Sequence, residues 1–418
     1  MGKPYSQELD AFAETFAWAK RQDVKNLRHF LLRWSGEHAV VVGSGGSFSA
    51  AVAVALFREL AHHSPTTAAT PLDFLSMLRR LSPRTFLLSA EGKNKDVLSA
   101  AAGAQNADLT SAALTLTPNN PLLDFARFGS AIRPFVFEMD WVKDGYLATN
   151  SLLATVLLFY KALFSPSDFE ESLAPIFDQQ RLSARRAELA NTPALADARH
   201  RGLLLLHSAT AKPFAVDLES KLSEAALATV QSTDLRQFAH GRHLQLAINA
   251  PGPVILLAAS TTDLALATAT AELLGTERDA HVIHIAGKTE QVVAISGLID
   301  AMFLTEALAQ SSPYDPGQPE VPSFGRAIHA LDVATLLRAQ PVVSRLEAAV
   351  KRKSHCAGHG TVASEQELRE AATNFVGRLT SASIRAIVCD FDGTLCRTEN
   401  RFDKMDADRR GSKTAVFG

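Results

Sequence analysis

Cysteine is scarce in this sequence of 418 residues: there are three, and all lie in the last quarter of the chain. Their number is odd and no CxxC or Cys/His ligand spacing occurs, which argues against a disulfide framework and a zinc site. An excess of one charge is also missing, because 42 basic and 44 acidic residues leave a net charge of −2. This balance argues against a dedicated nucleic-acid-binding protein, which usually carries a basic face.

Long apolar runs are missing as well. The best candidate for a membrane-spanning stretch, 152–164, contains Tyr160 and Lys161 and is shorter than the roughly 18 to 20 residues that span a bilayer. The first residues lack the apolar segment of a secretory signal. These absences predict a cytoplasmic protein in a reducing setting, with no membrane or nucleic-acid partner.

The remaining composition, with 47% apolar and 21% charged residues, is that of an ordinary globular protein. Short apolar segments alternate with longer helical patterns, and this sequence of elements occurs twice. The expected strands are 38–42, 85–88, 113–116, 134–138, 202–207, 253–258 and 281–286. Such alternation predicts parallel sheets with helices on both faces. The expected fold class is therefore α/β, with two doubly wound, three-layer units.

This pattern divides the chain into five expected parts. Residues 1–35 form an amphipathic N-terminal helix, and 36–170 form the first unit. After a polar stretch rich in Arg and Ala, 195–335 form the second unit. A basic linker with a helix follows at 336–383, and a short fragment of different character ends the sequence at 384–418.

A Gly/Ser-rich segment, GSGGSFSA at 43–50, lies between the first expected strand and its helix. Glycines such as Gly45 let backbone N–H groups and the positive end of a helix converge on one point, which suits an anion. The hydroxyls of Ser47 and Ser49 suit a polyhydroxylated ligand. The alternative is a tight turn in which glycine provides a positive φ angle.

A second polar segment, SAEGKNKD at 89–96, follows the next expected strand. Open α/β sheets bind ligands at the carboxyl ends of their strands, so two polar loops at neighbouring strand ends favour a binding site. The two loops resemble those of the sugar isomerase (SIS) domain family, G-x-G-T-S-x-x-A and S-x-S-G-x-T-x-D/E, with Gly46 in place of the first Thr. The resemblance implies that Ser47, Ser89 and Asn94 contact a phosphosugar.

Glu91 departs from the family pattern, which has a phosphate-binding hydroxyl at this place. A carboxylate there repels a phosphate dianion unless Lys93 or Lys95 compensates. Alternatively, Glu91 accepts hydrogen bonds from sugar hydroxyls or from an amine. The phosphorylation of the ligand therefore stays open.

The segment KDGYLATNS at 143–151 takes the place of the family's helix start G-V-A-S-T-K, which faces the site. This resemblance makes Thr149 and Ser151 candidate ligand contacts. Helix capping by the same hydroxyls is the alternative.

The second unit carries candidate acid–base residues. Its segments PFAVDLESKLSE (213–224) and VQSTDLRQFAHGR (230–242) resemble the isomerase half of glucosamine-6-phosphate synthase. The resemblance places Glu224 on the glutamate that moves a proton between two sugar carbons, and His240 on the histidine that assists ring opening. A carboxylate can move a proton next to a carbonyl, and histidine titrates near neutrality. The alternatives are a solvated helix residue and a loop-capping residue.

The resemblance implies an enzyme that isomerises, deaminates or deglycates a sugar or aminosugar, expected in phosphorylated form, with no cofactor or metal in these two units. In the synthase the histidine reaches the site from the neighbouring subunit, so a homodimer is expected. The synthase's lysine near the end of its second domain has no aligned lysine in DPGQPEVPSFGR (315–326). This difference favours the alternative of a non-catalytic, sugar-phosphate-binding regulatory module.

Near the end of the sequence, IVCDFDGTL (387–395) resembles the first motif of haloacid dehalogenase (HAD)-type phosphatases. The resemblance implies that Asp390 is a nucleophile and Asp392 a general acid/base, with Asp390 as a ligand of Mg²⁺ if the domain were complete. Since few residues follow, we expect a truncated, inactive HAD-like start. A longer protein would combine the two units with a sugar phosphatase.

Overall fold

Two parallel β-sheets form the framework of the protein, as the sequence predicts. The computed structural model describes residues 3–78, 80–126, 132–139, 144–192, 195–248, 252–275, 278–310, 312–332 and eight residues between 367 and 378. The first sheet has the strand order β2-β1-β3-β4-β5 and the second the order β7-β6-β8-β9, and every pair is parallel. The strands are β1 (Ala39–Val42), β2 (Thr66–Ala69), β3 (Arg84–Leu88), β4 (Ser111–Thr115), β5 (Ile132–Val136), β6 (Leu203–His207), β7 (Val230–Asp234), β8 (Val254–Ala258) and β9 (Ala280–His284).

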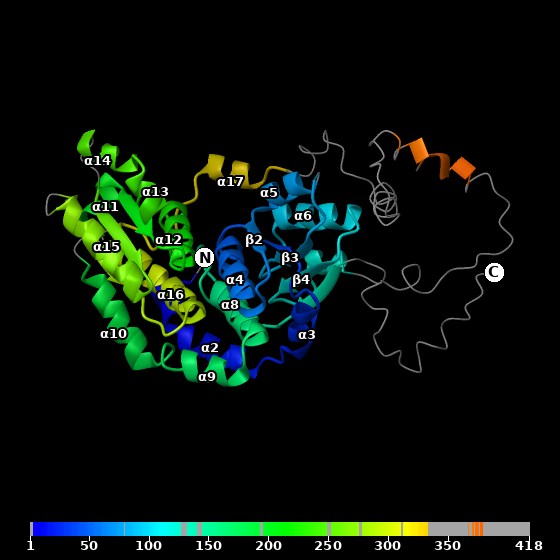
Figure 1. The fold of residues 1–418 in the computed structure, drawn as a ribbon, viewed down its shortest axis with the longest axis horizontal. Coiled ribbons are helices and arrows are strands. Elements are labelled where there is room, and N and C mark those ends of the chain that lie inside the picture. Colours follow the sequence, from blue (N-terminus) through cyan, green and yellow to red (C-terminus); the bar gives the residue numbers. More distant parts are fainter. Residues whose placement is uncertain are drawn as a thin grey trace. The chain divides into compact units, whose positions relative to one another are not determined.

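Helices connect and cover these strands (Figure 1). Those that precede or belong to the first sheet are α1 (Tyr5–Asp10), α2 (Phe12–Arg21), α3 (Lys25–Arg33), α4 (Gly46–His62), α5 (Pro71–Met77), α6 (Lys95–Asn106), α7 (Pro121–Asp124) and α8 (Asn150–Leu163). The others are α9 (Pro166–Leu173), α10 (Gln179–Ala190), α11 (Leu195–Arg201), α12 (Lys212–Glu224), α13 (Leu235–Ala239), η1 (Arg242–Leu244), α14 (Gln245–Ile248), α15 (Thr261–Leu274), α16 (Glu290–Ala309) and α17 (Ser323–His329).

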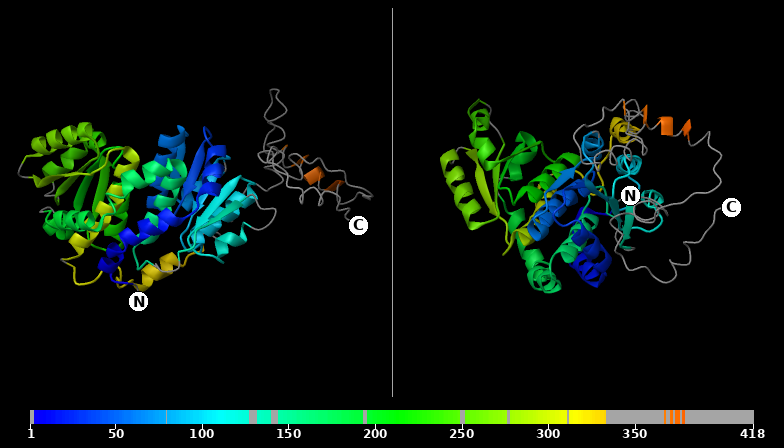
Figure 2. Two further views of the ribbon diagram at one scale, coloured as in Figure 1. Left: turned by 90° about the horizontal axis from the view of Figure 1, so that it is seen from below. Right: turned by 45° about the vertical axis from the view of Figure 1, so that its right-hand side comes forward.

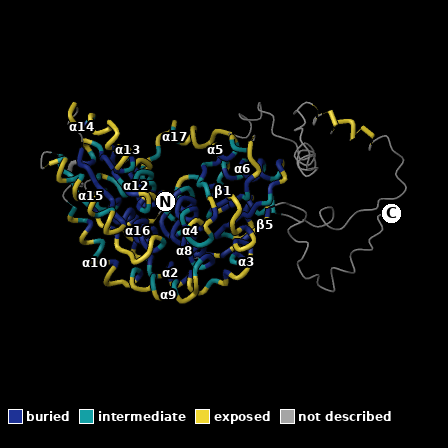
Figure 3. The backbone as a smooth tube through the Cα atoms, in the orientation of Figure 1, coloured by how far each residue is buried: buried dark blue, intermediate teal, exposed yellow. Residues whose placement is uncertain are grey.

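One central layer of helices, α4, α8, α12 and α16, lies between the two sheets (Figure 2). Its apolar side chains join the inner faces of both sheets in a single core. In Figure 3 much of the backbone in this central region carries the colour of buried residues. Helices α5 and α6 cover the outer face of the first sheet, and α13, α14 and α15 cover that of the second. The sheets therefore have helices on both faces, which confirms the predicted α/β class.

Strand order reverses in both sheets beside the first strand of the unit. After β1 the chain passes through α4 to β2 on one side and then to β3 on the other, and β6, β7 and β8 repeat this path. The carboxyl ends of β1 and β3 consequently point their loops toward a common region, which is where open α/β sheets bind ligands. This arrangement brings the two polar loops of the sequence to one edge.

The structure differs from the sequence expectations in several elements. The sequence predicts one helix over 1–35, but there are three. Helices α1 and α2 are separated at Ala11, and α2 and α3 are separated where Gln22 is extended and the Asp23 side chain accepts a hydrogen bond from Lys25 N. Strands β2 and β7 were not expected, since these edge strands are only partly buried and rich in Thr and Ser. The polar stretch between the units folds into α9, α10 and α11.

Among the described helices, only α16 is long and apolar enough to cross a membrane, judged by its length and composition alone. The candidate stretch in the sequence, 152–164, is a different and shorter segment, and it lies mainly in helix α8. In α16, 83% of the apolar window is buried inside the protein. This burial is the usual environment of a core helix.

Candidate functional site

The loop between β1 and α4 depends on its glycines. Gly45 has a φ of 54°, in the region that favours glycine. A side chain at Gly43 would place its Cβ 2.1 Å from the Ser47 carbonyl oxygen, and one at Gly46 would lie 2.1 Å from Ala148 Cβ. Gly46, which replaces the family's Thr, thus allows the start of α4 to pack against the residues that precede α8.

The predicted contacts of this first loop lie in different environments. Gly45 is exposed and Ser47 is half-buried, so both can be reached by a ligand. The side chain of Ser49 is fully buried, and its Oγ has no hydrogen-bond partner in the described structure. Ser49 is thus enclosed within α4 instead of facing the loop.

The second loop, between β3 and α6, also contains a required glycine. Gly92 has a φ of 64°, and its N–H donates to Ser89 Oγ at 3.1 Å. Asn94 caps α6, because its Oδ1 accepts hydrogen bonds of 3.0 Å from the N–H groups of Asp96 and Val97. The ligand contacts predicted at Ser89 and Asn94 therefore already have roles within the loop.

Glu91 and Lys93 extend from the same loop and form an ion pair of 3.5 Å. Their side chains are 47% and 68% exposed, so solvent weakens this pair. Glu91 can therefore interact with a ligand without first breaking a strong internal contact.

The start of α8 forms the opposite wall of the site. Asp144 accepts hydrogen bonds from the backbone N–H groups of Thr149, Asn150 and Ser151 at 3.0 to 3.1 Å. It also accepts from Ser151 Oγ at 2.5 Å and from Thr149 Oγ1 at 3.0 Å. The sequence identified Thr149 and Ser151 as candidates but not Asp144. The Asp144 carboxylate accepts hydrogen bonds from both residues and from N–H groups at the start of α8, which have no partner within the helix.

Behind this wall lies a buried glutamate from the N-terminal helix α1. Glu8 is 2% exposed and accepts hydrogen bonds from Gly145 N–H and Thr149 Oγ1. Burial, followed by the nearby Asp144 charge, raises the pKa of Glu8 to about 7, although the hydrogen bonds partly oppose this. Because Thr149 has one hydroxyl hydrogen for two carboxylates, a proton on Glu8 would satisfy both contacts.

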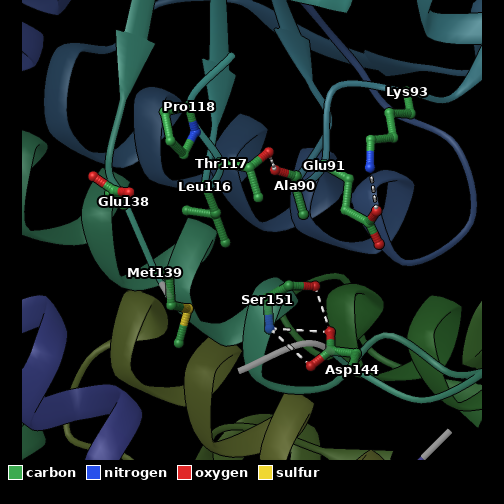
Figure 4. Close-up of a pocket in the computed structure, with 10 residues that line it drawn as sticks. All are labelled: Ala90, Glu91, Lys93, Leu116, Thr117, Pro118, Glu138, Met139, Asp144 and Ser151. Carbon is green, nitrogen blue, oxygen red and sulfur yellow. Dashed lines mark hydrogen bonds and ion pairs between the residues drawn. The ribbon is translucent and has the colours of Figure 1, made fainter. Parts of the chain in front are cut away.

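A cavity of about 330 Å³ lies between the second loop and the start of α8 (Figure 4). Its described lining comes from the ends of β3, β4 and β5 and from the segment that enters α8: Ala90, Glu91, Lys93, Leu116, Thr117, Pro118, Glu138, Met139, Asp144 and Ser151. Figure 4 shows Glu91 on one side of the space and the Asp144–Ser151 pair on another. The cavity can thus hold a small polar molecule.

Glu224 reaches the first loop from the second unit. It is the last residue of α12, and a Cβ added at Gly45 would lie 4.0 Å from Glu224 Oε1. The Ser220 hydroxyl donates a hydrogen bond of 2.5 Å to the same oxygen. Solvent reaches this side chain, but the protein atoms around it still remove enough water to raise the pKa of the Glu224 carboxyl.

A buried ion pair supports this end of α12. Lys221 Nζ lies 2.8 Å from Asp217 Oδ1, and the side chains are 3% and 0% exposed. The Lys221 charge acts on Glu224 and opposes the rise in its pKa. Asp217, Lys221 and Glu224 are four and three residues apart on one predicted helix, so they share a face of it. This spacing could have identified the cluster from the sequence.

Among the described residues, His240 forms no hydrogen bond or ion pair with this cluster. It lies at the end of α13, is exposed, and its ring makes no hydrogen bond or ion pair with the described residues. Asp390 and Asp392 lie outside the described residues, so the HAD-like fragment stays a prediction. Among the residues that the structure describes, no group of three or more His, Cys, Asp or Glu could hold a metal ion.

Comparisons with known proteins give a likeness at the level of structure. No protein-family model and no curated protein matches the chain. The C-terminal domain of glucosamine-fructose-6-phosphate aminotransferase from Francisella tularensis matches with a TM-score of 0.56 and 13% identity, over 75% of this chain and 96% of that one.

Two further structures match in the same way. Glucosamine-6-phosphate deaminase from Thermotoga maritima has a TM-score of 0.54 and 15% identity, over 76% of this chain and 97% of the other. Tagatose-6-phosphate ketose/aldose isomerase from Escherichia coli has a TM-score of 0.55 and 15% identity, over 77% and 98%. At these identities the likeness concerns the fold, and it confirms the prediction of two α/β units.

Proposed function

We propose that the protein binds a sugar or aminosugar at the edge of the first sheet and moves a proton on it with Glu224. The observation that carries this proposal is the position of Glu224 Oε1 beside Gly45, since it joins the acid–base candidate of the second unit to the glycine loop of the first. The likeness to structures described as sugar-phosphate isomerases, a deaminase and an aminotransferase domain supports a sugar ligand.

A chain of contacts links Glu224 to the cavity. Gly45 is followed by Gly46, which packs against Ala148, and Ala148 belongs to the segment between Asp144 and Ser151 that lines the cavity. We therefore propose that a ligand in the cavity extends along the loop toward the Glu224 carboxylate.

The carbon-to-carbon proton transfer needs one carrier. The Glu224 carboxylate takes a proton from the carbon next to the sugar carbonyl, and the electron pair left behind forms an enediol as the carbonyl oxygen gains a proton from solvent. Glu224 then gives its proton to the former carbonyl carbon while the neighbouring hydroxyl loses its proton to solvent and becomes the new carbonyl, so the isomerisation involves no net oxidation or reduction. Where an amine replaces that hydroxyl, the same shift gives an imine, and hydrolysis of the imine by water releases the amine, which is deamination or deglycation.

The rise in the pKa of Glu224 favours this role, because it shifts the carboxyl toward the neutral range in which an acid–base group both takes and gives protons. Ring opening is the proposed task of His240. Since it has no described contact with the Glu224 cluster in one chain, we propose a homodimer in which His240 of the partner subunit completes the site. A strictly monomeric active species would contradict this part of the proposal.

The test is turnover of hexoses and aminohexoses, each with and without a 6-phosphate, by the full chain and by Glu224→Gln. We expect the variant to lose about 10²- to 10⁴-fold in rate while it still binds sugar. Glu219→Gln is a matched control, because Glu219 accepts a hydrogen bond from Ser223 in the same way that Glu224 does from Ser220.

Three outcomes distinguish the candidates. Turnover that Glu224→Gln abolishes and Glu219→Gln retains supports the enzyme. Sugar binding without turnover supports the non-catalytic binding module, for which the exposed position of His240 is the favouring observation. Equal turnover by wild type and Glu224→Gln would refute the proposed role of Glu224.

A further inference from the structure

The cavity beside the second loop has two chemically different walls. Its apolar wall consists of Ala90, Leu116, Pro118 and Met139, and its charged wall includes Glu91 and Asp144, with Glu138 also in the lining (Figure 4). Lys93 is the one cation among the described lining residues, against three carboxylates. A ligand for such a space combines apolar surface with positive charge.

Three backbone N–H groups and one hydroxyl at the start of α8 are already occupied. The backbone N–H groups of Thr149, Asn150 and Ser151 all donate to the Asp144 carboxylate, as does the Ser151 hydroxyl. Helix N-termini commonly bind phosphate through such groups, but here a carboxylate of the chain occupies them. These four donors are neutral, so the negative charge of Asp144 remains at the wall of the cavity.

In the second loop, groups that the family resemblance predicts to contact phosphate already have partners within the loop. The N–H of Gly92 donates to Ser89, and the oxygen of the Asn94 side chain caps α6. Lys93 shares its charge with Glu91, which is itself a carboxylate at the cavity. A phosphate dianion would therefore meet Glu91 and Asp144 with one exposed lysine as compensation.

We infer that the cavity binds the protonated amine of an unphosphorylated aminosugar or sugar–amine conjugate. The ammonium group lies between Glu91 and Asp144, where it gains hydrogen bonds to charged acceptors. The C–H face of the sugar packs on Leu116 and Met139. This inference rests on the proposed function and specifies the substrate class of the same site.

The test is calorimetric titration of the full chain at about pH 6.5, below the ordinary pKa of an amine. The four probes are D-glucosamine, D-glucose, and the 6-phosphate of each. We expect glucosamine to bind about tenfold more tightly than glucose, because hydrogen bonds between charged groups are the stronger ones. A 6-phosphate adds no affinity, and added salt weakens glucosamine binding but leaves glucose binding unchanged.

Variants of Glu91 distinguish the effect of its negative charge on sugar affinity from the effect of its side-chain shape. Glu91→Gln lowers glucosamine affinity about fivefold and leaves glucose affinity unchanged. Glu91→Ser introduces a hydroxyl and raises affinity for the two phosphosugars. Glu272→Gln, at an exposed position on α15 in the second unit, changes none of these values.

The possible results show whether the amine inference fails alone or together with the proposed function. Tighter binding of phosphosugars than of glucosamine by the wild type, or an unchanged glucosamine preference in Glu91→Gln, overturns the amine inference and leaves sugar chemistry at Glu224 standing. Failure of all four sugars to bind overturns the proposed function, and the inference with it. Preference for glucosamine that depends on Glu91 supports both.

Discussion

The two units share a topology but differ in the loop that follows their first strand. In the first unit β1 is followed by 43–45, where Gly45 has a positive φ and leaves the backbone open to solvent. In the second unit β6 is followed by 208–211, which contains no glycine, and Pro213 lies in the first turn of α12. The first unit thus presents loop backbone to a ligand, while the second contributes side chains from a helix.

Two ion pairs, one beside the first unit and one in the second, differ in their burial. Lys20 and Glu170, on helices that pack against the first unit, form an ion pair whose side chains are 50% and 54% exposed. Asp217 and Lys221, on α12 of the second unit, form a pair that is almost completely buried. Burial makes a charge sensitive to the loss of its partner, so the second pair matters more to the fold.

Removing one partner of the buried pair is expected to have the largest effect. Lys221→Met leaves the Asp217 carboxylate buried and unpaired, and one of its oxygens already lacks a hydrogen-bond partner. We expect the free energy of unfolding to fall by about 3 to 5 kcal/mol, measured by urea denaturation. Its counterpart for the exposed pair, Glu170→Gln, is expected to change the free energy by less than about 1 kcal/mol.

A double variant provides the control for this prediction. Asp217→Leu combined with Lys221→Met removes both charges, so most of the lost stability should return. If the double variant is as unstable as Lys221→Met alone, packing and not the unpaired charge explains the loss.

The next effect concerns the region where the two units meet. Glu8 in α1 contacts the start of α8, while Tyr5 of the same helix donates its hydroxyl to the Met302 carbonyl in α16. The pKa of Glu8 is about 7, above its ordinary value of 4.5. The folded state therefore binds the Glu8 proton more tightly than the unfolded state does, and it is stabilised at low pH.

This stability is fully present below about pH 4.5 and is lost as the pH rises through about 7. The shift corresponds to at most about 3 kcal/mol. In Glu8→Gln this pH-dependent loss should disappear, as measured by urea unfolding from pH 5 to 8. Glu14→Gln, at an exposed position of α2, should keep the wild-type dependence; a Glu8→Gln variant that also keeps it would contradict the assignment.

The central strands could be predicted from sequence because they are continuous apolar segments that parallel sheets bury on both faces. Edge strands β2 and β7 could not, since their Thr and Ser residues resemble loops until a neighbouring strand pairs with them. The glycine loop and Glu224 were accessible through local patterns and family resemblance. The structure adds that they lie side by side, which spacing alone could not reveal.

Other parts of the site depend on contacts between distant residues. Glu8 and Thr149 are separated by 141 positions, so no local pattern could connect them. Asp144 precedes its helix by six residues and reaches the helix end through the shape of the intervening loop. Sequence analysis therefore found the hydroxyls at the start of α8 but not the carboxylate that binds them.

A smaller effect than that of Glu8 is expected at Asn94, where the resemblance predicts a ligand contact and the structure shows a cap of α6. Asn94→Ala should lower the free energy of unfolding by about 1 kcal/mol, because it removes the acceptor for two N–H groups of the first turn.

Asn94→Asp supplies the control, because it keeps the acceptor and should retain the stability. Calorimetric titration with D-glucosamine should give the same affinity for wild type and Asn94→Ala if the side chain acts as a cap alone. Weaker binding with unchanged stability would instead return Asn94 to the ligand, and the first unit would then bind sugar through side chains as well as through loop backbone.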